Sequence, residues 1–376
     1  MKKILISITI IVLSWAGIGY TEEANHYQKG YKHKIKSITT IKEPFVKSMD
    51  WHHGLNLIVF GKMDLQDKYY DVFIMKPDGS EEICLTGANQ QIPQKHNGNP
   101  AWHPSGEYIV YTAEHPEAPK KIDRYAIPGA GLGCNLWIMD RKGKKFYQLT
   151  NYSLKRPIKG VIHPQFSHDG TKLFWSERVR RGDHLYGGWV MKIADFVTNS
   201  GIPHLEKIET LTPGWKDSYF YESHAFAKND KKILFSGNLK PGQLAYGMDI
   251  YEMNLENGQL IQLTKTNDDW DEHAHYSPDG TKIVWMSSTG FDIDWSVVPK
   301  GKHFNYLSTE LWIMDSDGAN PQRLTYFNKP GHPHYIGEKT IVSDSSWGAD
   351  GKKMVVLIAY RTRRGMNSKL VMVEIE

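Results

Sequence analysis

Short apolar runs separated by turn residues recur along most of the chain, in a pattern typical of antiparallel β-strands. The clearest example runs from Asp271 to Thr325, where apolar segments around Ile283 and Leu311 alternate with two Asp-Gly turns. Asp-Gly between such segments is a strong hairpin signal, because both residues tolerate the positive φ of a tight turn. The stretch therefore predicts four short antiparallel strands.

The same four-strand pattern occurs six times. Five copies end their fourth strand in Leu-Thr, and an aromatic residue precedes the turn between the first two strands of every copy: Trp51, Trp102, Phe166, Phe226, Tyr276 and Trp347. Copies of roughly 50 to 70 residues are typical of radially repeated β architectures. The sequence thus predicts an all-β fold, a six-bladed β-propeller of four-stranded antiparallel blades, as a single domain over residues 21–376.

Three segments of the repeats can be compared with a known family. Trp102-His103-Pro104-Ser105-Gly106, Tyr276-Ser277-Pro278-Asp279-Gly280 and Leu311-Trp312-Ile313-Met314-Asp315-Ser316-Asp317-Gly318 resemble the repeats of TolB-like, WD-type propellers. The resemblance covers nearly the whole chain after residue 20 and implies the six-bladed fold. It implies less about function, because the family includes binding platforms, peptidase-associated propellers and some metal-dependent lyases.

The last copy lacks a fourth strand after residues 370–375, whereas residues 34–39 resemble a fourth strand without a blade. Pairing the two segments would close the ring and remove two exposed sheet edges, which otherwise invite aggregation. We therefore predict that the N-terminal strand completes the C-terminal blade.

Residues 1–20 have the pattern of a secretory signal peptide: two lysines, an apolar run over residues 4–18, and small residues near its end. The run is shorter than the ~20 residues that a spanning helix needs, so no stable membrane anchor is expected. The pattern predicts an exported protein, periplasmic or in an equivalent extracytoplasmic compartment. The mature chain is expected to begin near Tyr20 to Glu23.

Charge and cysteine content limit the classes of partner and cofactor. The formal net charge of +4 includes the two lysines of the signal peptide, so the remaining chain is nearly neutral. Without a basic stripe, nucleic acid is not an expected partner. Neither cysteine, Cys84 or Cys134, belongs to a Cys-x-x-Cys-His motif, so no covalently bound cofactor is expected. Whether the two form a disulfide is left open, because the sequence does not give their separation.

Long connections concentrate on one face of the predicted disc, which we call the long-loop face. They comprise residues 114–133, 177–187, 287–309 and 326–340, and residues 195–207 form the exception on the opposite face. Long loops on a rigid scaffold commonly carry binding function. We therefore expect one or more protein partners on this face. Four residues of the fifth-blade loop either pack that loop down or anchor a partner: Trp295, His303, Phe304 and Tyr306.

Candidate site residues occupy equivalent repeat positions, seven residues before the first turn of each copy, or lie within two residues of such a position. A propeller's rotation brings such positions to equal radii, so these side chains should surround the channel mouth on the long-loop face. The predicted ligand-binding set comprises Asn99, His163, Glu222, Ser223, His224, Glu272, His273, His275 and Asp344. Imidazoles and carboxylates from different blades could bind a divalent metal, for which the expected ligands are His163, His273 and Asp344, or act as general acid and base. The alternative is a water-filled channel lined by polar side chains.

Two groups of arginines lie in corresponding connections of the third and sixth blades. They are candidates for binding an anion through paired donors, or else they are solvated loop charges: Arg178, Arg180, Arg181, Arg361, Arg363 and Arg364.

Two classes of function fit these features. The first is an exported platform for protein or ligand binding or for assembly, including a cofactor-free subunit of a periplasmic redox complex; the lack of a nucleophile motif favours it. The alternative is a metal-dependent lyase or hydrolase that acts on an acidic, uronate-like substrate at the His/Asp/Glu site. Similar chemistry is known among TolB-like propellers, and the arginines would then hold the substrate carboxylates.

Overall fold

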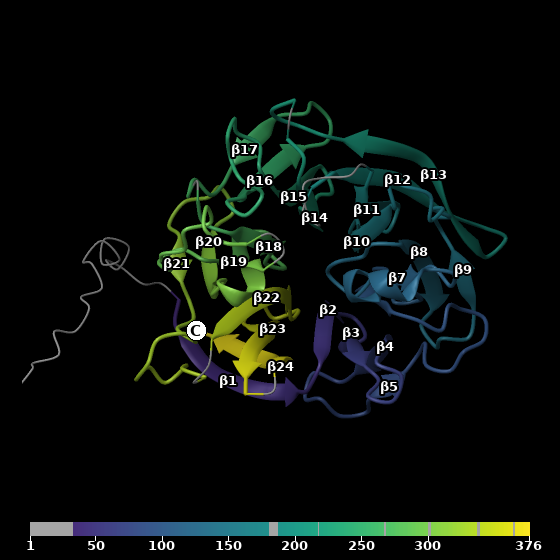
Figure 1. Ribbon diagram of the computed structural model, residues 1–376, viewed down its shortest axis with the longest axis horizontal. Coiled ribbons are helices and arrows are strands. Elements are labelled where there is room, and N and C mark those ends of the chain that lie inside the picture. The colour runs from purple at the N-terminus through teal and green to yellow at the C-terminus, as the bar shows by residue number, and fades with distance from the viewer. Residues whose placement is uncertain are drawn as a thin grey trace, which may run out of the picture.

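The computed structural model describes residues 33–179, 187–216, 218–266, 268–299, 302–336, 339–363 and 365–376. Six four-stranded antiparallel sheets are arranged in a ring, each running outward from an innermost strand (Figure 1). The predicted six-bladed β-propeller is therefore confirmed. No helix among these residues is long and apolar enough to cross a membrane.

The first three blades follow chain order. Blade 1 contains β2 (Val46–His52), β3 (Leu57–Met63), β4 (Tyr70–Met75) and β5 (Ile83–Cys84); blade 2 contains β6 (Asn97–Trp102), β7 (Tyr108–Glu114), β8 (Cys134–Asp140) and β9 (Phe146–Gln148); blade 3 contains β10 (Gly160–Phe166), β11 (Lys172–Arg178), β12 (Trp189–Asn199) and β13 (Ile202–Leu211).

The remaining blades complete the ring. Blade 4 contains β14 (Tyr221–Phe226), β15 (Lys232–Gly237), β16 (Asp249–Asn254) and β17 (Leu260–Gln262); blade 5 contains β18 (Asp271–Tyr276), β19 (Lys282–Ser287), β20 (Glu310–Asp315) and β21 (Gln322–Arg323); blade 6 contains β22 (Thr340–Trp347), β23 (Lys353–Thr362), β24 (Gly365–Ile375) and β1 (Ile35–Lys42). Two 3-10 turns, Lys120–Tyr125 and His303–Asn305, lie in the second- and fifth-blade loops.

The ring closes through β1, which lies beside β24 in Figure 1. The antiparallel register pairs Ile38 with Val373 and Thr40 with Val371, and this confirms the predicted closure. Backbone and side-chain hydrogen bonds of 3.4 and 2.6 Å also join His33 to Gln322 in blade 5. The N-terminal strand therefore connects two adjacent blades.

The core consists of apolar side chains between neighbouring blades rather than one central cluster. Between blades 5 and 6, for example, buried Val284 and Leu311 share a cluster with Val356 and Val371. Burying each such side chain contributes about 1.5–3 kcal/mol, and every blade depends on its neighbours for this burial.

The third blade differs from the prediction. The insertion at residues 195–207 is not an irregular loop, because β12 and β13 extend through it and pair from Asp195–Glu206 to Asn199–Ile202. Alternating buried and less buried residues, such as Phe196 and Val197, continue the strand pattern up to the turn at Ser200 and Gly201. Long strands thus account for the extra length.

Both cysteines are free thiols, which answers the question that the sequence left open. Cys84 is exposed on the outermost strand of blade 1, and Cys134 is buried at the start of β8.

Candidate functional site

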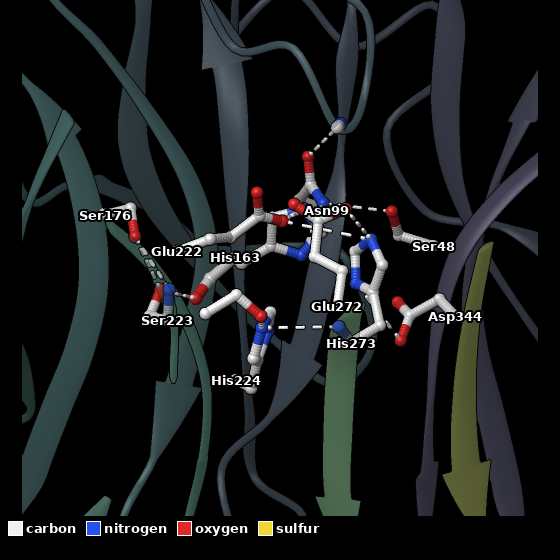
Figure 2. A network of polar contacts seen from close by, with 12 residues as sticks. Ser48, Asn99, His163, Ser176, Glu222, Ser223, His224, Glu272, His273 and Asp344 are labelled. Carbon is white, nitrogen blue, oxygen red and sulfur yellow. Dashed lines mark hydrogen bonds and ion pairs between the residues drawn. The ribbon is translucent and has the colours of Figure 1, made fainter. Parts of the chain in front are cut away.

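Polar side chains from all six innermost strands meet in one connected network, which we call the axial cluster. It contains Ser48 on β2, Asn99 on β6, His163 on β10, Glu222 on β14, Glu272 and His273 on β18, and Asp344 on β22 (Figure 2). Because these strands belong to six different blades, the cluster must lie at the axis of the ring. The structure therefore brings together the side chains that the repeat register grouped.

A backbone irregularity aims these side chains. Asn99, His163 and His273 lie within their strands, at points where the pairing with the second strand of the blade shifts register. At these bulges Asn99, His163 and His273 have φ values of 45°, 49° and 54°. A positive φ is uncommon for histidine and costs about 1–3 kcal/mol, and such strain is found more often at functional sites. The bulges turn the side chains in a direction that a regular strand would not allow.

Hydrogen bonds define the tautomer of His163. The Gly129 N–H donates to Asn99 Oδ1 at 2.6 Å, so the Asn99 amide nitrogen faces Ser48 Oγ at 2.9 Å and His163 Nδ1 at 3.5 Å. An amide nitrogen only donates, which makes Nδ1 the acceptor of the ring. Nε2 then carries the proton and donates to Glu222 Oε1 at 3.0 Å. Burial lowers the pKa of His163 to about 3, an effect that the neighbouring His273 reinforces, so the ring is neutral.

His273 is oriented in the same way. Its Nε2 lies 3.6 Å from Glu272 Oε2 and 3.8 Å from Glu222 Oε1, whereas its Nδ1 lies 3.7 Å from Asp344 Oδ1. In both histidines, Nε2 thus faces the glutamates. The Nδ1–carboxylate separation exceeds a hydrogen bond but is close to the roughly 3–3.5 Å between two ligand atoms that share a metal at about 2.0–2.2 Å from each.

The two glutamates act as a pair. Burial raises the pKa of Glu222 well above its usual value, and the charge of Glu272 and a hydrogen bond between the two carboxyl groups raise it further. One proton shared by the pair relieves the repulsion of two buried like charges. The Trp270 Nε1–H donates to Glu272 Oε2 at 2.7 Å and holds that carboxylate in place.

Asp344 is the ionised member of the cluster. Burial alone would raise its pKa, but His273, His275 and His163 together lower the pKa below its ordinary value. The distance from His275 Nε2 to Asp344 Oδ1 is 3.0 Å. Asp344 therefore supplies a carboxylate oxygen that a nearby imidazole orients.

Two predicted residues play supporting parts. Ser223 links β14 to β10 of the neighbouring blade, because its Oγ donates to the backbone oxygen of His163 at 2.9 Å. His224 contacts Ser236 Oγ at 2.6 Å through Nε2, and its buried Nδ1 has no hydrogen-bond partner in the part of the chain that the structure describes. The His273 backbone N–H also donates to His224 Nε2 at 3.3 Å, which joins His224 to the cluster.

The donor geometry fits a divalent metal. Among the described residues, two groups each have potential ligand atoms within 4.8 Å of one another: His163, His273 and Asp344, and Glu222, His224 and His273. The first group is the set predicted from the sequence. Its members are 7–9% exposed, so they are enclosed by protein yet still in contact with solvent.

Three of the six candidate arginines lie in the described part of the chain: Arg178, Arg361 and Arg363. Arg178 is buried at the end of β11, where its Nη1 donates to the Ile158 backbone oxygen at 2.9 Å. Arg361 is exposed and donates to Asn305 Oδ1 at 3.1 Å, and Arg363 is exposed at the β23–β24 turn. Arg180, Arg181 and Arg364 lie outside the described residues, as does the signal peptide predicted at residues 1–20. An anion-binding role for the arginines thus stays a prediction.

The fifth-blade loop divides into packed and exposed parts. Trp295 and His303 are buried and form an aromatic cluster with Tyr246 and Trp270. Phe304, by contrast, is 52% exposed, and Val297 and Tyr306 are also exposed. Trp295 and His303 therefore hold the loop in place, and the other side chains remain available for contact.

Sequence reasoning missed Lys47, on β2. It pairs with Gly61, the fifth residue of the second strand of its blade. Glu222 and Glu272 pair with the equivalent fifth residues, Ser236 and Met286. The repeat register places Lys47 in the same position as the two glutamates. An ammonium group is neither an imidazole nor a carboxylate, so it does not match the pattern of a metal or acid–base site.

Similarity to known proteins is low. No protein-family model matches the chain. Over 244 residues it is 22% identical to a dipeptidyl-peptidase 5 of Porphyromonas endodontalis, a match covering 59% of this chain but only 34% of that protein. Similar solved structures include a putative TolB from Agrobacterium tumefaciens (15% identity, 74% of this chain and 89% of that chain, TM-score 0.44) and the propeller domain of the trilobed protease from Pyrococcus furiosus (15%, 88% and 82%, TM-score 0.43). These similarities concern the fold alone.

Proposed function

We propose that this TolB-like six-bladed propeller binds a divalent transition metal ion in its axial cluster and uses it for hydrolase or lyase chemistry. The observation that carries the proposal is the shared orientation of His163 and His273. Both place Nε2 against buried glutamates, and His273 places Nδ1 beside the ionised Asp344. A metal-binding histidine commonly donates its second ring N–H to a carboxylate, which fixes the ring.

Each group of residues has a distinct role in this proposal. His163, His273 and Asp344 would hold the ion, and two imidazoles with one carboxylate suit Zn²⁺, Mn²⁺ or Fe²⁺. Such an ion polarises a carbonyl group or lowers the pKa of a bound water molecule. The Glu222–Glu272 pair orients both rings, and its shared proton is one that the site can give or take.

Metal analysis tests this proposal. The protein purified without chelator should contain close to one transition metal ion per chain, which EDTA removes and Zn²⁺ or Mn²⁺ restores. Metal-dependent turnover in a screen of ester, peptide and uronate substrates would support the enzymatic part. A purified chain that binds no transition metal at micromolar concentration would contradict the proposal.

The exposed part of the fifth-blade loop favours a second candidate function, that of a docking platform for a protein partner, such as another subunit of an exported complex. Val297, Phe304 and Tyr306 are 67%, 52% and 43% exposed on a loop that buried aromatic residues hold in place. Exposed aromatic side chains on a fixed support are typical anchors of protein interfaces. The apolar run of residues 4–18 supports export of the chain for either function.

The double substitution V297D/F304D tests the docking function. Because both side chains are exposed, the variant should fold and keep its metal content, yet it should lose its partner during purification from the native source. Leu65→Asp, an equally exposed change on blade 1, serves as the control. The docking role is wrong if the double variant keeps the same stoichiometric partner as the wild type.

A further inference from the structure

Lys47 is a charged residue at the axis without a counter-charge. Its pairing with Gly61 gives it the same position in blade 1 that Glu222 and Glu272 have in blades 4 and 5. By the rotation that relates the blades, its side chain should start toward the axis as theirs do. The ammonium group has no hydrogen-bond or ion-pair partner among the described residues.

Hydrogen bonds connect the residue after Lys47 to the metal-ligand candidates. The next residue, Ser48, accepts a hydrogen bond from Asn99 Nδ2 at 2.9 Å, and the same amide lies 3.5 Å from His163 Nδ1. Lys47 is therefore on the opposite side of the same mouth from the glutamate pair.

Gly61 and Pro128 border the space around Lys47. A Cβ at Gly61 would lie 3.6 Å from Lys47 Cβ and 3.8 Å from Pro128 Cγ, so the missing side chain leaves room beside the lysine. Burial lowers the pKa of Lys47, and no neighbouring charge contributes to that shift. Lys47 is partly buried, and an ammonium group withdrawn from water without a counter-charge is destabilised, a cost that an anionic ligand would reduce.

We propose that Lys47 is the anion-binding residue of the axial site and that its ligand is a small carboxylate. The inference rests on the proposed function only in that the same ligand would reach the metal. A carboxylate suits the mouth better than a phosphate, because Glu222 and Glu272 on blades 4 and 5 and Asp344 on the neighbouring blade 6 would repel a dianion more strongly than a monoanion. The position of Lys47 thus favours monoanionic carboxylates as the substrate class of the axial site.

Calorimetric titration with D-galacturonate and with D-galactose, its uncharged analogue, tests the role of Lys47. The wild type should bind galacturonate at least about tenfold more tightly than galactose. K47M should abolish this preference, and K47R should restore part of it. K172M, which removes a lysine at the start of β11, should behave as the wild type.

The same titration after metal removal separates the two proposals. A galacturonate preference that survives EDTA treatment but disappears in K47M supports Lys47 as the anion-binding residue, whether or not the metal proposal holds. The inference is wrong if the wild type shows no preference for galacturonate, or if K47M keeps it. Absence of bound metal in the untreated wild type would contradict the metal proposal and leave the role of Lys47 to be decided by the galacturonate preference.

Discussion

Replacing His273 with alanine is expected to reduce metal affinity by more than about 100-fold, because the side chain belongs to both groups of candidate ligands. Isothermal titration with Zn²⁺ and Mn²⁺ provides the measurement. His163→Ala should have a similar effect. Neither change should unfold the protein, because the alanine substitutions remove none of the apolar packing between blades and leave the β18 ladder intact.

His103→Ala is the matched control for these variants. His103 comes directly after β6, in the β6–β7 turn on the face opposite the long-loop face. There its Nε2 contacts the Gly170 backbone oxygen at 3.1 Å. The His103→Ala variant should bind metal as the wild type does. Equal metal affinity in wild type, His103→Ala and His273→Ala would show that the ion binds elsewhere.

Removing β1 is expected to destabilise the whole ring rather than one end of the chain. A chain starting at Glu43 exposes the edge of β24 and loses the contacts of Ile35 and Ile38 with the cluster between blades 5 and 6. The free energy of unfolding should fall by more than about 3 kcal/mol, and the exposed edge should promote aggregation. Urea denaturation followed by tryptophan fluorescence measures this change.

A chain starting at His33, which keeps β1, is the control for the truncation. A synthetic peptide of residues 33–42 should restore stability to the shorter chain by strand addition, whereas a peptide of the same composition in scrambled order should not. Equal unfolding curves for the two chains would show that β1 does not close the ring.

The fold could be predicted from the sequence because the strand and turn signals are local and recur in every blade. Six aromatic residues before six turns specify the blades, and the unpaired strand at residues 34–39 specifies the closure. The same register predicted that His163, His273 and Asp344 converge, because equivalent positions of a rotating repeat must meet at the axis. These predictions needed no knowledge of side-chain conformation.

Other features could not be derived from the repeat. The orientation of His163 and His273 depends on positive φ values within bulges, and no residue type at those positions signals them. Arg178 was predicted to lie in a connection of the third blade, yet it ends β11 and its guanidinium group donates to the backbone oxygen of the partly buried Ile158. Residues 195–207 match an insertion in the repeat, because the sequence does not show that β12 and β13 stay paired beyond the length of the other strands.

The most direct test of the metal proposal is anomalous X-ray diffraction from crystals grown with Zn²⁺ or Mn²⁺. We expect a single strong peak at the ring axis, within about 2.0–2.3 Å of His163 Nδ1, His273 Nδ1 and a carboxylate oxygen of Asp344. An axis without an anomalous peak, in crystals soaked at millimolar metal concentration, would contradict the assignment of the axial cluster as a metal centre.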